Sequence, residues 1–104
     1  MSRYSVLITE KAISDMMDIT RYISNDLLEP SSADRLLEKF QVTIAGLSTM
    51  PKKHELVNDD WLAQRHIRKI FVDNYIIFYT VDDSEFIVYV IRVLYGKRDW
   101  INLI

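Results

Sequence analysis

The most informative part of the chain is residues 67–94, which read IRKIFVDNYIIFYTVDDSEFIVYVIRVL. Three runs rich in β-branched and aromatic residues, 67–72, 75–81 and 86–94, are separated by two short polar breaks. That composition is typical of strands joined by tight turns. The first break is Asp73-Asn74, whose side chains tolerate the positive φ that a two-residue hairpin needs. The stretch therefore predicts an antiparallel three-stranded meander.

The second and third of these strands are expected to lie in the middle of a sheet. Both are nearly unbroken apolar runs, as in strands that are buried on both faces. Arg92 interrupts the third run, and its simplest role is to pair with a carboxylate near the end of the sheet.

The first half of the chain predicts one strand and two helices. Residues 4–9 are short, β-branched and roughly alternating, which indicates a strand, and Thr9 is well placed to cap the helix that follows. Apolar residues then recur every three or four positions over about five turns, until Pro30 interrupts the pattern. A second helix is expected to restart at Ser31 or Ser32 and to end at Met50-Pro51. The apolar stripes are Ala12, Met16, Ile19, Ile23 and Leu27 in the first helix, and Ala33, Leu36, Leu37, Phe40, Ile44 and Leu47 in the second.

The predicted order is β-α-α-β-β-β, which implies an α+β fold: an antiparallel sheet with a helical hairpin packed on one face. The 104 residues are 49% hydrophobic and 27% charged, typical of a single globular domain that spans residues 1–104. There is no cysteine, and hence no disulfide framework and no thiolate nucleophile. No apolar run approaches the length of a membrane span or a signal peptide, so we expect a cytoplasmic protein without a membrane partner.

Within the second half of the chain, most of the basic residues are gathered in three short segments. These are residues 52–54, 65–69 and 97–98, and they can form a local basic surface although the net charge is −2. A fork of Lys97 and Arg98 after a central strand is suited to phosphate, because arginine donates parallel hydrogen bonds to phosphate oxygens.

Standard catalytic and cofactor motifs are absent from the sequence. Gly46 and Gly96 are the only glycines, which excludes a P-loop and a dinucleotide fingerprint. His54 and His66 are 12 residues apart and lack the spacing of a zinc protease, so we predict neither a metal nor a cofactor. Acid–base chemistry would have to use Arg, Lys, His or Tyr side chains.

Two segments resemble the RelE/ParE toxin superfamily. Residues 64–69 (QRHIRK) lead into 72–82 (VDNYIIFYTVD), and residues 90–100 read VIRVLYGKRDW. The N-terminal segment agrees, with Tyr4, Val6, Ile8 and Thr9 followed by Ala12, Asp18-Ile19 and Tyr22-Ile23. The resemblance covers nearly the whole chain, and the fold of the family has the predicted order of elements.

The resemblance implies the toxin of a type II toxin–antitoxin module. Members of the RelE branch enter the ribosomal A site and cut mRNA, whereas members of the ParE branch poison DNA gyrase. Both kinds of toxin are silenced by a small antitoxin protein that wraps around them. The expected partners are therefore a cognate antitoxin and either the ribosome with its mRNA or DNA gyrase.

The site residues implied by the RelE branch are only partly present. Arg98 matches the arginine of its Gly-Lys-Arg turn, Lys97 is the neighbour of that arginine, and Arg68 matches a basic strand residue. Ile76 stands where the branch has a second-strand arginine, and no tyrosine follows Trp100. Acid–base roles would fall to Lys97, Tyr95 or His66, with packing as the alternative role of Tyr95.

Three functions remain open at this point. Ribosome-dependent mRNA cleavage by a metal-independent endoribonuclease ranks narrowly first, on Arg68, Lys97 and Arg98. Gyrase inhibition is a close second, because the final strand of the ParE branch has a residue pattern similar to Ile91-Arg92-Val93-Leu94. The third is a non-toxic module that only binds an antitoxin.

Overall fold

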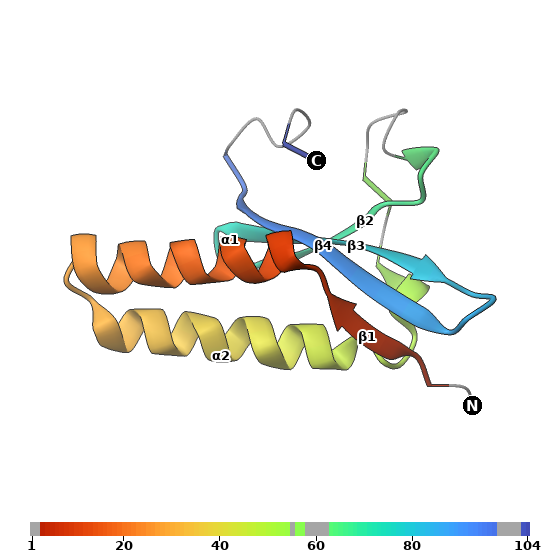
Figure 1. Cartoon of the computed structure of the whole chain (residues 1–104), viewed down its shortest axis with the longest axis horizontal. Coiled ribbons are helices and arrows are strands. Elements are labelled where there is room, and N and C mark those ends of the chain that lie inside the picture. The colour runs from red at the N-terminus through yellow and green to blue at the C-terminus, as the bar shows by residue number, and fades with distance from the viewer. Residues whose placement is uncertain (1–2, 55, 58–62, 98–102) are drawn as a thin grey trace.

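The computed structural model describes residues 3–54, 56–57, 63–97 and 103–104. It confirms the predicted order of elements, which Figure 1 shows from end to end. The elements are β1 (Ser5–Ile8), α1 (Glu10–Arg21), a π-helical turn (Tyr22–Asp26), α2 (Pro30–Gly46), a 3₁₀ turn (Pro51–Lys53), β2 (Arg68–Val72), β3 (Tyr75–Asp82) and β4 (Ile87–Tyr95). No described helix is both long and apolar enough to cross a membrane.

The four strands form one sheet in the order β1-β4-β3-β2. The meander of β2, β3 and β4 is antiparallel, as predicted, and β3 and β4 are its central strands. The prediction of a wholly antiparallel sheet is wrong for one pair, because β1 runs parallel to β4, with Ser5 opposite Ile87 and Ile8 opposite Val90. The helices carry the chain from β1 to the far edge of the sheet, and two hairpins then return it in the direction of β1.

The caps and ends of the helices follow from local chemistry. Thr9 caps α1 as predicted, since its side chain accepts a hydrogen bond from the N–H of Ala12 at 3.2 Å. The α-helical part is shorter than the predicted five turns, because the helix widens into the π-helical turn after Arg21. The second helix begins at Pro30, where a missing N–H costs nothing, rather than at a serine, and it ends at Gly46 before Met50.

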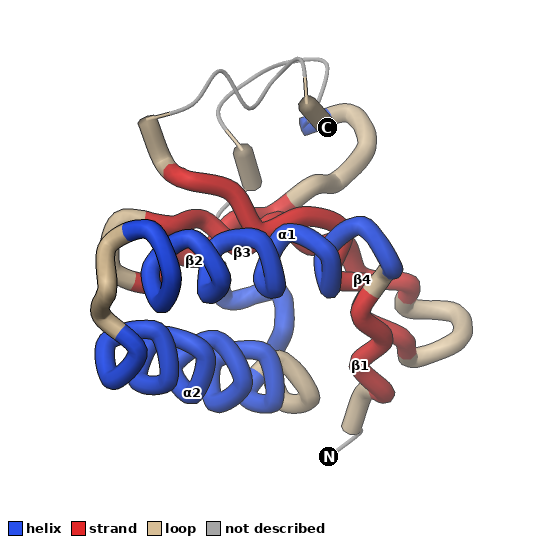
Figure 2. Tube along the Cα trace, turned by 60° about the vertical axis from the view of Figure 1, so that its left-hand side comes forward, coloured by secondary structure: helices blue, strands red, loops and turns tan. Residues whose placement is uncertain are grey.

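Both faces of the central strands are buried, as their continuous apolar runs predict. The helices cover one face, and this first core contains Ala12, Met16, Leu36, Phe40, Ile44, Leu47, Val72, Ile77, Tyr79, Val88, Val90 and Val93. A second core covers the opposite face and contains Val57, Ile67, Ile76, Phe78 and Leu94, with Ile91, Leu103 and Ile104 packed against it. Figure 2 shows the two helices side by side and the C-terminus on the far side of the strands from α2.

Candidate functional site

Arg68 lies at the start of β2 on the helix-covered face of the sheet. It stands opposite Tyr79 in the register, and directly paired residues of an antiparallel sheet point to the same face. Its Nη1 donates hydrogen bonds to the carbonyl oxygens of Lys52 at 3.2 Å and of His54 at 2.7 Å. Arg68 therefore anchors the 3₁₀ turn and the residue that follows it to the sheet.

Two of the predicted site residues, His66 and Arg68, line the same cavity. Its volume is about 290 Å³, and Lys52, Val81 and Asp83 complete the lining. The basic segments 52–54 and 65–69 meet at this corner, although they are far apart in the sequence.

Asp83 offsets part of the positive charge at this corner. Its Oδ2 lies 2.6 Å from Nζ of Lys52, and its Oδ1 accepts a hydrogen bond from the Tyr4 hydroxyl at 2.8 Å. These two hydrogen bonds lower the pKa of Asp83 and keep it ionised. The cavity therefore presents a paired lysine and a bound guanidinium rather than an open cluster of cations.

Tyr79 holds the same 3₁₀ turn from inside the first core. Its buried hydroxyl donates a hydrogen bond of 2.6 Å to the carbonyl oxygen of Pro51. Burial raises the pKa of Tyr79 to about 12. A phenol with such a pKa keeps its proton at neutral pH, so Tyr79 supplies structure rather than a general base.

Tyr95 and Lys97 lie at the opposite end of the sheet from Arg68. Tyr95 stands opposite Tyr75, and the two ring centroids are 5.7 Å apart. Arg68 pairs with Tyr79, which in turn stands opposite Val90 on β4. Five residues of strand separate Val90 from Tyr95, which is about 16 Å. The structure thus divides the predicted site residues into two groups, and Arg98 lies outside the described residues.

Ile76 is buried in the second core, so an apolar side chain fills the place of the second-strand arginine. Lys69 is on this same face, opposite Phe78, with its Nζ 5.6 Å from the ring centroid of Phe71. The alternation of side chains separates Lys69 from Arg68, as expected, and the strand register assigns Arg68 to the helix-covered face.

Arg92 pairs with a carboxylate, as predicted, and the partner is Asp15 of α1. Nε lies 2.7 Å from Oδ2 and Nη2 lies 3.0 Å from Oδ1. The other guanidinium nitrogen, Nη1, donates to the carbonyl oxygen of Leu103. This geometry raises the pKa of Arg92 and ties β4 to α1 and to the C-terminal residues.

An apolar groove lies between α1, α2 and β1, where the helical hairpin meets the edge of the sheet. It has a volume of about 460 Å³ and is lined by Val6, Ile8, Ile13, Met16, Met17, Thr20, Leu37, Gln41, Ile44 and Ala45. β1 is an edge strand beside the groove, and Leu7 and Ile8 are exposed on it. The signal of this groove in the sequence is Ile13 and Met17, two apolar residues of the first helix that stand outside its predicted stripe.

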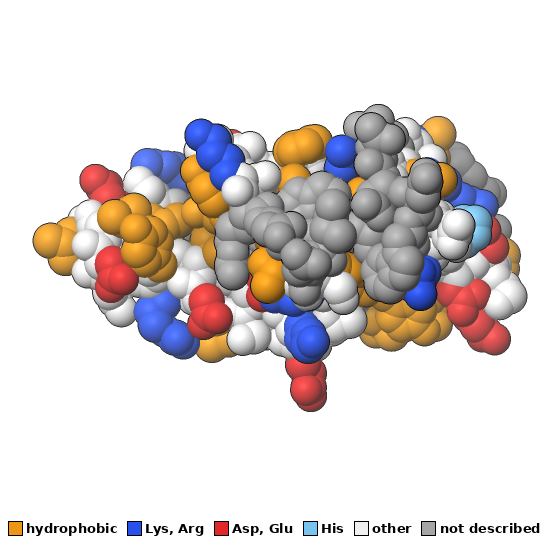
Figure 3. Space-filling view, turned by 90° about the horizontal axis from the view of Figure 1, so that it is seen from above, with side chains coloured by type: hydrophobic (Ala, Val, Ile, Leu, Met, Phe, Trp, Pro, Cys, Tyr) orange, Lys and Arg blue, Asp and Glu red, His pale blue; other side chains and the backbone are white. Residues whose placement is uncertain are grey.

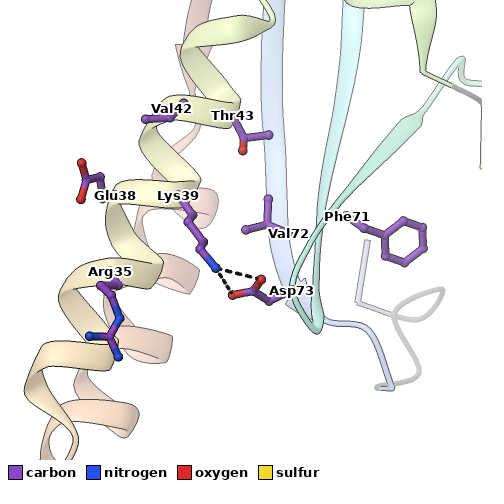
Figure 4. A pocket seen from close by; sticks show the side chains of 8 residues that line it. All are labelled: Arg35, Glu38, Lys39, Val42, Thr43, Phe71, Val72 and Asp73. Carbon is purple, nitrogen blue, oxygen red and sulfur yellow. Dashed lines mark hydrogen bonds and ion pairs between the residues drawn. The ribbon is translucent and has the colours of Figure 1, made fainter.

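A second hollow lies between α2 and β2, and Figure 4 shows its lining. Its volume is about 560 Å³, and the ion pair of Lys39 and Asp73, at 3.2 Å, spans it. It contains none of the predicted site residues. Among the described residues, no group of three or more His, Cys, Asp or Glu side chains could hold a metal ion.

Three solved structures with a similar fold belong to toxin–antitoxin systems. The chain is similar to one in the chromosomal ParDE system of P. aeruginosa, with a TM-score of 0.74 and 13% identity over 91% of this chain and 98% of that chain. It is similar to one in the RelBE2 complex of Mycobacterium tuberculosis, with a TM-score of 0.59 and 19% identity over 89% of this chain and 98% of that one. The intact E. coli RelBE complex gives a TM-score of 0.54 and 20% identity over 91% of this chain and 99% of that one.

Comparison of the sequence with family models identifies the family. No curated protein matches the sequence significantly. The model described as "ParE toxin of type II toxin-antitoxin system, parDE" matches residues 6–100, which is nearly the whole chain. The chain therefore belongs to the ParE toxin family of the RelE/ParE superfamily, whose members are toxins of type II toxin–antitoxin systems.

Proposed function

We propose that this toxin arrests growth by inhibiting DNA gyrase, as the ParE branch does, rather than by cutting mRNA. This reverses the order that the sequence alone favours. The proposal depends chiefly on one observation, the second core, which fills the sheet face opposite the helices with apolar side chains.

Cleavage of RNA through its 2′-hydroxyl needs a proton acceptor, a proton donor and positive charge at the phosphate, all within a few ångströms. Against the second core, a cavity of about 380 Å³ gathers Lys11, Arg65 and Arg92, but its described lining includes no His, Tyr or carboxylate side chain that could exchange a proton. Arg68 is on the other face and is hydrogen-bonded to two carbonyl oxygens, and Tyr95 packs edge-to-face against Tyr75 at the far end. This distribution supports a toxin that acts by binding a protein.

The apolar groove of α1, α2 and β1 supports a cognate antitoxin as the partner. The structural neighbours from P. aeruginosa, M. tuberculosis and E. coli are toxin–antitoxin complexes. An antitoxin segment can lay an apolar helix face in the groove or add a strand to the outer edge of β1. Ordering such a segment on binding is typical of disordered regions.

The test compares two activities of the purified toxin. We expect it to inhibit gyrase supercoiling of plasmid DNA, and we expect added antitoxin to restore supercoiling. Primer extension on mRNA under translation should show no cut. The matched control is Arg98→Ala, since removal of a charge stabiliser costs a nuclease about 100- to 1000-fold in rate.

Two outcomes would contradict the proposal. Normal supercoiling together with ribosome-dependent cleavage that Arg98→Ala abolishes would identify an endoribonuclease. Unimpaired growth of cells that express soluble toxin alone would identify a module that only binds the antitoxin.

A further inference from the structure

The connection between α1 and α2 is an exposed apolar tip. Tyr22, Leu27 and Leu28 lie there, and their exposed fractions are 53%, 52% and 79%. Figure 1 shows this connection at one end of the molecule, beyond the sheet, and Figure 3 shows hydrophobic side chains at that end. We call these three residues the tip patch.

The backbone of the tip favours glycine at the position that Leu28 occupies. The N–H of Glu29 donates to the carbonyl oxygen of Ile23 at 3.0 Å, a closure one residue wider than the 6→1 hydrogen bond that ends many α-helices, because the turn before it is π-helical. The residue before that donor then takes a left-handed conformation, and the φ of Leu28 is 55°. Glycine adopts this conformation without strain, whereas leucine does not.

Packing explains another strained residue but not Leu28. Phe86 also has a φ of 55°, and its ring lies against Tyr4 with a centroid distance of 5.4 Å. Leu28 has most of its side chain in solvent. Met50 is strained and exposed as well, but of the two only Leu28 lies next to a π-helical turn, and strained residues and π-helical turns both concentrate at functional sites.

Charge at the tip indicates the kind of partner. Asp26 and Glu29 are exposed beside the tip patch, and Arg21 is paired with Asp18 at 3.6 Å. An apolar centre with a carboxylate rim repels nucleic-acid phosphates and complements a protein pocket that has a basic rim. None of the three residues lines the groove proposed for the antitoxin.

We propose that the tip patch is the surface through which the toxin contacts gyrase, at an apolar pocket with a basic rim on the gyrase protein. This inference rests on the proposed function. The two surfaces then bind different partners: the groove of α1, α2 and β1 binds the antitoxin, and the tip patch binds gyrase.

The test uses Leu28→Gly, a variant that removes the side chain and also relieves the strain. Its Tm should be no lower than that of the wild type, so a loss of function cannot come from unfolding. The toxin concentration for half-inhibition of supercoiling should rise about tenfold or more, as expected for an anchor residue. Antitoxin affinity should stay the same, and Leu28→Met, which keeps an apolar side chain, should retain inhibition.

Met50→Gly is the matched control. Met50 has a φ of 49° and is 64% exposed, and it lies beyond the other end of α2. We expect the same effect on Tm and no effect on supercoiling. If Leu28→Gly inhibits gyrase as strongly as the wild type, or if it weakens antitoxin binding as much as gyrase inhibition, the assignment of the tip patch to gyrase is wrong. The proposed function would still stand. Failure of the wild-type toxin to inhibit gyrase would overturn both this inference and the proposed function.

Discussion

Asp15 shows how one carboxylate can hold a helix against a strand. Its Oδ2 accepts hydrogen bonds from Nε of Arg92 and, at 3.0 Å, from the N–H of Val93, while Oδ1 accepts from Nη2 of Arg92. The last residue of β1, Ile8, stands opposite Val90. Beyond that point Asp15 of α1, rather than a residue of β1, accepts the hydrogen bond from the Val93 N–H of β4. Both side chains of the pair are largely buried, and loss of either partner leaves the other charge without compensation.

We expect Asp15→Ala to lower the free energy of unfolding by about 3 kcal/mol, since it leaves Arg92 unpaired and the Val93 N–H without its acceptor. Urea denaturation at neutral pH measures the change. Asp18→Ala is the control, because its pair with Arg21 is exposed and worth about 0–1 kcal/mol. Equal losses in the two variants would contradict a structural role for the buried pair.

Tyr79 makes the stability of the fold sensitive to alkaline pH. Its pKa is about 12 in the folded chain, against 10.0 for an ordinary tyrosine. The unfolded chain therefore releases this proton first, and its contribution to stability is complete below pH 10 and disappears between about pH 10 and pH 12. The contribution is about 2–3 kcal/mol, because one pKa unit corresponds to 1.36 kcal/mol.

Tyr79→Phe should remove this part of the alkaline loss. At neutral pH the variant should be about 1 kcal/mol less stable, since the Pro51 carbonyl oxygen loses its donor. Urea denaturation at pH 8 and pH 11 compares the two chains. Tyr4 and Tyr75 also have raised pKa values and remain in both chains, so the difference reports Tyr79. If the wild type and Tyr79→Phe lose the same free energy of unfolding between pH 8 and pH 11, the alkaline loss does not come from Tyr79.

At the scale of elements, the edge of β1 and the adjacent groove form an apolar open surface. An exposed edge strand without charge or proline is a ready template for a further strand. Leu7 and Ile8 give β1 this character, and Ile13 and Met17 of α1 extend it across the groove. A partner that binds here can combine backbone hydrogen bonds with apolar contacts.

Met17→Glu should weaken antitoxin binding by about tenfold or more, because it places an unpaired carboxylate in the apolar contact. Met17 is 53% exposed, so the free toxin should keep its Tm. Val42→Glu, at a residue of α2 that is 66% exposed and lines the other hollow, is the matched control. Isothermal titration with the antitoxin measures both affinities. Equal weakening by both variants would place the antitoxin elsewhere.

At the scale of the whole molecule, both faces of the sheet are covered. The helices occupy one face, and the second core with Leu103 and Ile104 occupies the other. In the part of the chain that the structure describes, the sheet edges, the groove and the tip patch are among the surfaces open to partners, along a molecule that is 43 Å long. Such a distribution is suited to binding proteins, in agreement with the gyrase proposal.

Local chemistry makes much of this fold predictable from the sequence. Thr9 caps its helix by a hydrogen bond with the N–H of Ala12, three positions away, and Asp73 turns its hairpin with a φ of 52°. The apolar runs of β3 and β4 likewise identify central strands, because burial on both faces requires apolar residues at every position.

The tertiary structure alone decided what depends on distant residues. The parallel direction of β1, the choice of Asp15 for Arg92 and the distance between Arg68 and Tyr95 all follow from pairings across the fold. Spacing along the chain does not encode the strand register, so it could not divide the predicted site residues between two ends of the sheet. Leu28 was missed for a related reason, since only the closure of the helix by Glu29 imposes a left-handed conformation on a residue that is not glycine.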